Sequence, residues 1–261
     1  MRSYVRNIKK RPDVPFFNCL LIGQIANGKT SFINSAVTAI ADEGRRKSPF
    51  TVYSRGKEST TKTLCLCPLL VNEDEDVRLR FYDCRGLHDI ESLWFDDIMN
   101  IINGHILPGY EFDSNTPITK EHEMYRKDPK LADKMHCVVY VINATAPKEA
   151  LATKTAEETF EKIRQELTKS NIPQLILMTK VDNFHKNFQE DLEKIFYSNY
   201  VKMMRDFIAQ YTSLTKDRVL LQANYCGETS ISPQKDFLTL YNLQKIVESI
   251  EDYIKYVLMK D

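Results

Sequence analysis

The sequence lacks the features that would place it in several broad classes of protein. No stretch reaches the roughly 18 apolar residues that a membrane-spanning helix needs, and the first residues lack the apolar core of a secretory signal. Arg2 stands where myristoylation requires glycine, and the last residues carry no prenylation motif. Basic and acidic residues number 36 each, so bulk charge favours neither nucleic acid nor a membrane surface. We expect a cytoplasmic protein without a membrane anchor or a nucleic-acid partner.

The cysteines are few and scattered. The sequence has six, and no CxxC pair occurs, so a zinc site is not expected. They are Cys19, Cys65, Cys67, Cys84, Cys137 and Cys226. Because most lie in apolar stretches, they are typical of buried, reduced thiols in a cytosolic protein. The length of 261 residues fits one large α/β domain or two small ones.

A glycine-rich turn near the start of the chain organises the rest. The apolar run 16–22 predicts a buried strand, and residues 33–40 are apolar at helical spacing. Between them, Gly23 and the Gly28-Lys29-Thr30 triplet form the pattern GxxxxGK[ST], a P-loop in its required context of strand and helix. The glycines permit backbone angles that turn successive N–H groups inward. Together with the helix N-terminus, these groups make a nest for phosphates.

Two side chains of this motif have separate predicted roles. Lys29 would reach the β- and γ-phosphates of a nucleotide, and the Thr30 hydroxyl would be a ligand of Mg²⁺. The predicted phosphate-binding residues are Gly23, Gln24, Ile25, Ala26, Asn27, Gly28, Lys29, Thr30 and Ser31.

The segment between the first helix and the strand expected at 64–71 is rich in threonine. In nucleotide switches, a loop at this place provides a Thr whose hydroxyl completes the Mg²⁺ shell and whose N–H senses the γ-phosphate. Thr61 is the predicted residue, and Thr60 and Thr63 are the alternatives.

The strand expected at 77–82 ends in Asp83-Cys84-Arg85-Gly86, a DxxG motif. Asp83 would hold Mg²⁺ through a water molecule. The Gly86 N–H would bond the γ-phosphate, so that hydrolysis of the nucleotide releases the segment.

The residues after this motif leave hydrolysis open. Leu87 stands where Ras-like enzymes carry a glutamine that orients the attacking water, and an apolar side chain cannot do this. His88 is a candidate substitute. Arg55 and Arg85 are candidates for an arginine finger supplied by the chain itself, which is worth up to ~10³–10⁵ in rate.

A second motif lies on the far side of a long irregular stretch. After a helix expected within 90–104, residues 104–134 are too long for an ordinary connection and predict an insertion. The strand expected at 173–178 ends in Thr179-Lys180-Val181-Asp182, which matches the guanine-specificity motif [NT]KxD. The Asp182 carboxylate would accept hydrogen bonds from N1 and N2 of guanine, two donors that adenine cannot offer together. The stem of Lys180 would lie along the base.

The last third of the chain predicts two helices around a short strand. A long amphipathic helix is expected over 188–208, with its Met and aromatic residues in the core. After a strand at 219–221 come Asn224 and Tyr225, where GTPases place a loop whose backbone contacts O6 of guanine. A final helix at 240–259 either seals the sheet, which is the favoured interpretation, or offers a docking surface.

Six segments, in this order and spacing, resemble the interferon-induced protein 44 family. They are residues 23–31, 83–87, 104–110, 117–119, 135–138 and 179–182. The run from Gly104 to Phe112 is the most diagnostic, because general GTPases lack it. Thr179-Lys180-Val181-Asp182 is closer to the general GTPase motif than to the Thr-His-Val-Asp of the family, which strengthens the prediction of guanine specificity.

The resemblance runs from about Phe16 to the C-terminus. It implies a cytoplasmic guanine-nucleotide-binding G domain of vertebrate innate immunity, with antiviral or antiproliferative effects. Family members often carry an extra N-terminal domain, so we expect this chain to be a short member or an excised G domain.

The expected fold is a doubly wound, mostly parallel α/β sheet flanked by helices, with nucleotide at the carboxyl ends of the strands. Residues 1–15 would be a flexible lead-in and 16–261 the G domain. The expected cofactors are Mg²⁺ and GTP or GDP, and the expected partners are a GTP-dependent second copy and unidentified immune signalling proteins. Two functions stay open: a slow GTPase switch, and a nucleotide-binding scaffold with little hydrolysis. Asp182 disfavours an ATPase.

Overall fold

The computed structural model describes residues 1–41, 47, 49–50, 63–72, 75–85, 95–113, 115–148 and 154–260. Its strands are β1 Phe17–Ile22, β2 Thr63–Asn72, β3 Glu75–Arg85, β4 Cys137–Asn143, β5 Gln174–Thr179 and β6 Val219–Gln222. The α-helices are α1 Arg2–Arg6, α2 Lys29–Ala41, α3 Phe95–Ile102, α4 Lys154–Lys169, α5 Lys186–Glu190, α6 Asn199–Tyr211 and α7 Pro233–Leu258. Short 3₁₀ helices are η2 Leu131–Asp133, η4 Val181–Phe184, η5 Leu192–Phe196 and η6 Lys216–Arg218.

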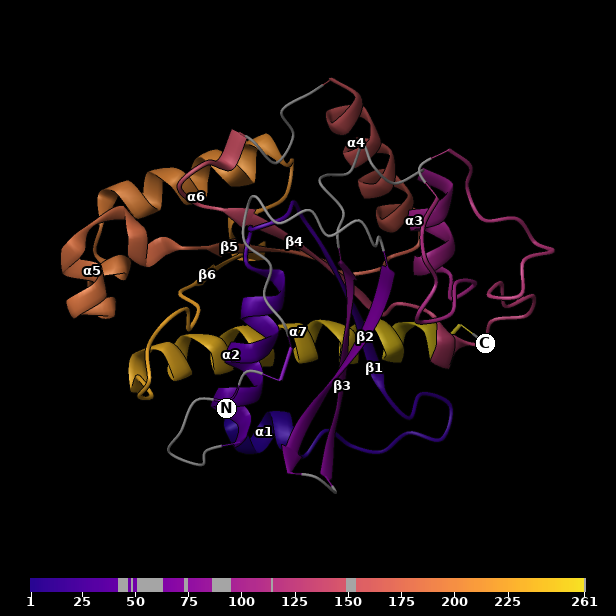
Figure 1. Ribbon diagram of the computed structural model, residues 1–261, viewed down its shortest axis with the longest axis horizontal. Helices are drawn as coiled ribbons and strands as arrows, with labels where there is room; N and C mark the ends of the chain where they lie inside the picture. The colour runs from indigo at the N-terminus through magenta and orange to yellow at the C-terminus, as the bar shows by residue number, and fades with distance from the viewer. Residues whose placement is uncertain are drawn as a thin grey trace.

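The strands form one six-stranded sheet in the order β2-β3-β1-β4-β5-β6. Every neighbouring pair is parallel except β2 and β3, which pair antiparallel. In Figure 1, α2 and α7 lie on one side of this sheet and α3, α4 and α6 on the other. Because helices cover both faces, every side chain of β1 and β5 is buried, which explains their continuous apolar runs. The predicted fold class, a doubly wound and mostly parallel sheet flanked by helices, is confirmed.

The first fifteen residues differ from the expected flexible lead-in. They contain α1, and Val5, Ile8 and Val14 are buried in the core. Arg2 and Arg6 donate hydrogen bonds to the carbonyl groups of Ala39 and Ile40 at the end of α2. The last carbonyl groups of a helix have no partner within it, and they favour a cation nearby. The start of the chain is therefore part of the folded domain.

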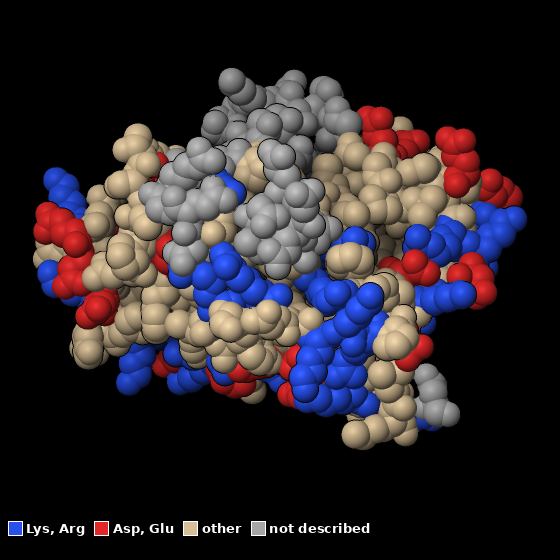
Figure 2. Space-filling model, turned by 90° about the horizontal axis from the view of Figure 1, so that it is seen from below, with Lys and Arg blue, Asp and Glu red and all other residues tan. Residues whose placement is uncertain are grey.

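Basic side chains are dense at this end of the molecule. Arg2, Arg6, Lys9, Lys10 and Arg11 lie within the first eleven residues. Figure 2 shows the face at the bottom of Figure 1, where Lys and Arg side chains gather across the middle. Since the two residues of α1 in this set bond to the end of α2, part of this positive charge stabilises the fold itself.

The stretch expected as an insertion follows α3 and is mostly irregular. In its described part, 104–113 and 115–134, η2 is the only helix, and pairing is limited to isolated bridges such as that between Ile106 and Tyr125. Gly104 has φ of 80°, and a Cβ there would lie 2.6 Å from the Asp133 carbonyl oxygen. Asp97 of α3 accepts a hydrogen bond from the Ile118 N–H at 2.8 Å. Glycine and this buried carboxylate hold the stretch against α3.

The prediction of one long helix over 188–208 is wrong. The chain forms α5, η5 and α6 there, as separate short elements. The Asp191 side chain accepts from the Glu193 N–H and starts η5, while the Ser198 side chain accepts from the Val201 N–H and starts α6. Such side chains offer the backbone N–H groups an alternative to a continuing helix.

The expected core stripe of this region also needs correction. Phe196 and Met203 are both 57% exposed, so part of the Met and aromatic stripe faces solvent. By contrast, the buried face of α7 covers the sheet, with Leu243, Ile246 and Ile250 fully buried. This helix begins at Pro233, seven residues before the expected 240, because Ser232 caps it and proline suits the first helical position.

The cysteines are all free thiols. Cys19, Cys67, Cys84 and Cys137 are buried and Cys65 is half-buried, in keeping with the sequence prediction. Cys226 differs from it, because its loop after β6 leaves the residue exposed.

His136 joins the start of β4 to β1 in the core. Its Nδ1 accepts from the Asn18 N–H at 2.9 Å, and its Nε2 lies 2.9 Å from the Leu131 carbonyl oxygen. These contacts use both ring nitrogens of a neutral imidazole. The ring is fully buried, and burial lowers the pKa of His136 to about 4, against the smaller opposing effect of the Leu131 carbonyl.

We expect acidification to destabilise the protein through His136. The unfolded chain takes up a proton near pH 6.5, but the native state does not until about pH 4, so stability is full above this window and falls through it as the pH falls. Across this window, the free energy of unfolding falls by up to about 3 kcal/mol. Urea unfolding of the wild type and of His136→Gln, whose amide can make both contacts but does not titrate, measures it. Equal pH slopes in the two proteins would contradict this role.

Candidate functional site

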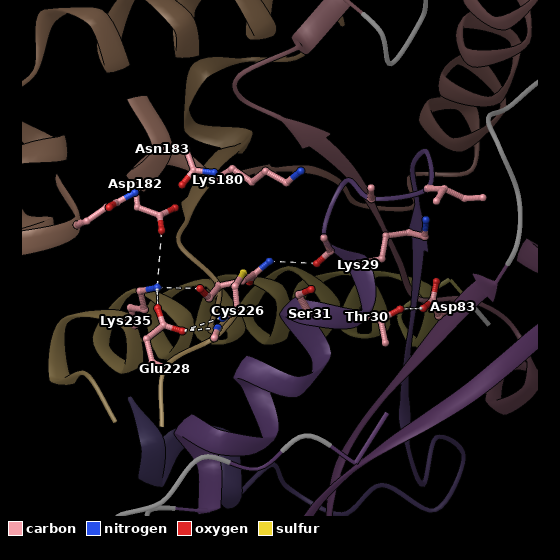
Figure 3. Close-up of a pocket in the computed structure, with 16 residues that line it drawn as sticks. Lys29, Thr30, Ser31, Asp83, Lys180, Asp182, Asn183, Cys226, Glu228 and Lys235 are labelled. Atoms are coloured by element: carbon pink, nitrogen blue, oxygen red, sulfur yellow. Dashed lines mark hydrogen bonds and ion pairs between the residues drawn. The ribbon is translucent and has the colours of Figure 1, made fainter. Parts of the chain in front are cut away.

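A cavity of about 800 Å³ opens at the carboxyl ends of the parallel strands. Its lining comes from the loop between β1 and α2, the first turns of α2 and α7, the end of β3, the turn after β5, α5 and the loop after β6. Figure 3 shows these side chains converging on one space from distant parts of the sequence. In open α/β sheets, ligands bind at this edge, so the cavity is the candidate site.

The loop between β1 and α2 needs glycine at both ends of its motif. Gly28 has φ of 95°, and a Cβ there would lie 2.9 Å from Asn224 Nδ2. At Gly23, a Cβ would lie only 2.4 Å from the Val141 carbonyl oxygen. Ala26 takes the left-handed conformation too, with φ of 65°. This winding brings the N-terminus of α2 to the cavity wall, where the first N–H groups of the helix have no partner within the helix and its dipole is positive.

The loop is tied to three neighbouring segments of the sheet edge. Asn27 Nδ2 donates to the Val141 carbonyl oxygen at 3.0 Å, and Thr179 Oγ1 donates to the Asn27 carbonyl oxygen at 2.6 Å. Asn224 Nδ2 donates to the Gly28 carbonyl oxygen at 3.1 Å. These contacts come from residues that the sequence predicts to bind nucleotide, yet they hold the loop in place.

Lys29 begins α2 and crosses the mouth of the loop. Its Nζ donates to the carbonyl oxygens of Gly23 at 2.6 Å and Gln24 at 3.1 Å. The side chain lines the cavity, and the residue is only 8% exposed. A cation held beside the N-terminus of α2 gives this part of the cavity a positive potential that suits an anion.

Thr30 and Asp83 form an oxygen-rich pair on the next wall. Thr30 Oγ1 donates to Asp83 Oδ2 at 2.8 Å, as Figure 3 shows. Asp83 is 1% exposed, and its Oδ1 has no hydrogen-bond partner in the described part of the chain. An unpaired buried carboxylate oxygen is costly, which makes it a candidate to meet a ligand.

This pair fits Mg²⁺ better than a metal held by the protein alone. No group of three or more His, Cys, Asp or Glu side chains able to hold a metal occurs among the described residues. Mg²⁺ takes hard oxygen ligands and is usually bound through one or two protein groups, with waters and phosphate oxygens as the rest. The Thr30 hydroxyl and the Asp83 carboxylate meet that requirement.

Asp182 lies at the other end of the cavity, in η4 just after β5. Burial raises its pKa, and this effect is opposed by Lys235, whose Nζ lies 3.6 Å from Asp182 Oδ2. Lys180 precedes it with φ of 60°, and its side chain also lines the cavity. Figure 3 shows Asp182 and Asp83 far apart, with the P-loop between them.

Most residues of the sequence prediction meet at this cavity. The described ones that line it are Ile25, Ala26, Gly28, Lys29, Thr30, Ser31, Asp83, Lys180, Asp182 and Asn224. Four other predicted residues lie behind the lining and do not face the cavity: Gly23, Gln24, Asn27 and Thr179. Their hydrogen bonds hold Lys29 and the loop in place.

Tyr225 has a different place from the predicted one. Its ring is buried, and its hydroxyl bonds Ser232 and Asp236 at the start of α7. Its N–H donates to Ser35 Oγ of α2 at 3.0 Å. A backbone donor used in this way does not suit the predicted contact with guanine O6. Tyr225 joins α2 to α7 beneath the site.

Several predicted residues lie outside the described part of the chain. They are Arg55, Thr60, Thr61, Gly86, Leu87 and His88. Arg85 ends β3, and Thr63 begins β2 opposite it in the antiparallel register.

Sequence reasoning missed the charged residues on the Asp182 side of the cavity. Glu228 and Lys235 both line it, and they form an ion pair. Burial alone would raise the pKa of Glu228, but hydrogen bonds from Lys235 and from backbone N–H groups lower it to about 2. A serine followed by a proline is typical of a helix start, so Ser232 and Pro233 predict the start of α7 and put Lys235 in its first turn. Nothing in the pattern shows that this side chain faces the cavity.

Comparison with known proteins finds relatives whose similarity covers 90% of this chain. No family model matches. Interferon-induced protein 44 of Mus musculus is 29% identical over 237 residues, which cover 90% of this chain and 55% of the mouse protein. The interferon-induced protein 44-like protein and interferon-induced protein 44 of Homo sapiens are 27% and 26% identical, over 90% of this chain and 52% of each relative. The resemblance to the interferon-induced protein 44 family is confirmed.

The chain spans about half the length of the curated relatives it matches. Among solved structures, it is similar to a probable GTP-binding protein EngB, with a TM-score of 0.45 and 12% identity, over 92% of this chain and 99% of that one. Within the described residues, a helix of sufficient length and apolarity to cross a membrane is not found.

Proposed function

We propose that this chain is a guanine-nucleotide-binding protein that takes GTP and GDP together with Mg²⁺. The observation that carries the proposal is a single cavity with three chemically distinct parts. The Thr30–Asp83 pair, the P-loop with Lys29, and Asp182 follow one another along it. A metal ion, a phosphate chain and a base follow one another in the same way in a nucleotide.

Each part suits one portion of the ligand. The N-terminus of α2, the loop N–H groups and Lys29 would hold the α-, β- and γ-phosphates. Thr30 would bind Mg²⁺ directly and Asp83 would bind it through a water molecule. When bound, the ion would neutralise part of the negative charge of the phosphates. Ser31 follows in the same first turn of α2 and would add a polar contact to the phosphates.

Asp182 would select the base. Its carboxylate accepts hydrogen bonds, and guanine offers two adjacent donors at N1 and N2, whereas adenine has an acceptor at N1 and no amino group at C2. The stem of Lys180 would lie along the base. This chemistry supports guanine over adenine and disfavours the interpretation as an ATPase.

Lys29→Ala should abolish nucleotide binding. The change removes the cation beside the phosphates, and each hydrogen bond between a charged group and its partner contributes about 1.5–3 kcal/mol. Fluorescence titration with a labelled GDP measures the affinity, with circular dichroism as a check of the fold. Lys154→Ala, on a lysine whose side chain is 88% exposed on α4, is the matched control. Unchanged affinity of Lys29→Ala would refute the phosphate-binding role.

Asp182→Asn should move base preference from guanine toward xanthine. Xanthine carries an oxygen at C2 where guanine has an amino group, so the amide nitrogen of asparagine can donate to it. Competition of GTP against XTP for the site measures the change. Asp252→Asn, on a carboxylate whose side chain is 81% exposed on α7, should leave it unaltered. An Asp182→Asn protein that still prefers GTP would remove the claim of base recognition.

In the cell, we place this domain as a slow GTPase switch of a cytoplasmic, interferon-induced antiviral response. The family resemblance supports this role, with a GTP-dependent second copy and immune signalling proteins as partners. Thr61 as a further metal ligand, Gly86 as γ-phosphate sensor and Arg55 as arginine finger complete the proposal for the enzyme. Leu87, where Ras-like enzymes have a water-orienting glutamine, favours a second function, a nucleotide-binding scaffold with little hydrolysis.

Turnover measured against protein concentration separates these two functions. For a switch activated by a second copy, phosphate release per molecule of protein should climb with concentration, by up to ~10³-fold if an arginine finger is engaged in the pair. For a scaffold, GTP should stay bound and intact at every concentration. Lys29→Ala provides the blank for contaminating phosphatases. A constant, non-zero rate per molecule would reject self-activation.

A further inference from the structure

Lys235 holds a central position on the base side of the cavity. Its Nζ donates to the Asn224 carbonyl oxygen at 2.8 Å and pairs with Glu228, and it lies 3.6 Å from Asp182 Oδ2. The side chain is only 13% exposed, and its ammonium lies 5.7 Å from the centre of the Tyr225 ring. Figure 3 shows it between Asp182 and Glu228.

In the loop after β6, three successive backbone N–H groups already donate to acceptors within the protein. The Tyr225 N–H donates to Ser35 Oγ, while the N–H groups of Cys226 and Gly227 donate to Glu228 Oε2 at 2.8 and 3.0 Å. These contacts fix Glu228, and Glu228 in turn fixes Lys235. These three N–H groups therefore have acceptors already, while the ammonium group of Lys235 lines the same part of the cavity as a further donor.

An ammonium group has three N–H donors. Two of those on Lys235 are used by Asn224 and Glu228, and the third is directed at no acceptor closer than Asp182 Oδ2, at 3.6 Å, among the hydrogen bonds and ion pairs described for Lys235. That distance is beyond a good hydrogen bond, so the donor can be shared with a ligand.

We propose that Lys235 is a specificity-determining residue, which donates a hydrogen bond to O6 of guanine beside Asp182. The inference rests on the proposed function, since it names the second half of base recognition at the same site. On the guanine edge, the acceptor O6 is attached to C6, and the donor N1–H is bonded to that same carbon. A cation and a carboxylate side by side match this order of acceptor and donor.

Adenine presents the reverse order on the same edge, with an amino group at C6 and an acceptor at N1. Lys235 would face a donor and Asp182 an acceptor, so both protein groups would lose their partners. Leaving buried polar groups unpaired is the strongest means by which a site rejects a similar ligand. Asp182 and Lys235 therefore act together against adenine.

The test compares GDP with 6-thio-GDP, which keeps N1–H and the 2-amino group but replaces O6 by sulfur, a weak acceptor. Isothermal titration calorimetry in the presence of Mg²⁺ gives both affinities. We expect the wild type to prefer GDP by about tenfold, as suits one hydrogen bond from a charged donor. Lys235→Met should lower this preference to about one. Lys235→Arg, which keeps a charged donor, should restore part of it.

Lys245→Met is the matched control. This lysine lies on the same helix α7, pairs with Glu248 at 2.8 Å and does not line the cavity. Its variant should keep the wild-type preference. If Lys235→Met fails to fold, Lys235→Leu, which also lacks a hydrogen-bond donor, takes its place, with the same expected loss.

Two results would overturn the role of Lys235: an equal affinity of the wild type for GDP and 6-thio-GDP, or an unchanged preference in Lys235→Met. Failure of the proposed function looks different, because the wild type would then bind neither nucleotide.

Discussion

The seating of the P-loop on the edge of the sheet is the constraint on which the rest of the site depends. Gly23 passes so close to Val141 that no side chain fits between them. Asn27, Thr179 and Asn224 then hold the loop by hydrogen bonds from three directions. Because these bonds join the loop to β4, β5 and the loop after β6, they hold Lys29 and Thr30 in place relative to Asp182 on the other side of the cavity.

Two kinds of residue therefore share the motifs. Some face the cavity, such as Lys29, Thr30 and Asp182, and their chemistry is available to a ligand. Others, such as Asn27 and Thr179, use their polar groups in hydrogen bonds within the protein, behind the residues that line the cavity. A binding site needs both, since groups that contact a ligand work best when other residues hold them in position before the ligand binds.

The strands and the P-loop could be predicted from the sequence by their apolar periodicity. The placement of Asp83 and Asp182 could also be predicted, because each comes at the end of a predicted strand on the same edge of the sheet. The sequence pattern did not predict features that depend on local hydrogen bonds between side chains and the backbone. The breaks at Asp191 and Ser198 depend on local caps within an amphipathic pattern that fits a continuous helix. The place of Lys235 depends on the path of a loop, which periodicity does not describe.

The arginines of α1 have a consequence for the site at the opposite end of α2. Lys29 and Thr30 stand on the first turn of this thirteen-residue helix, while Arg2 and Arg6 hold the carbonyl groups of its last turn. The helix that carries Lys29 and Thr30 is thus held at its other end by residues from the start of the chain. A substitution of Arg2 or Arg6 would therefore weaken the support of α2 without changing any side chain that lines the cavity.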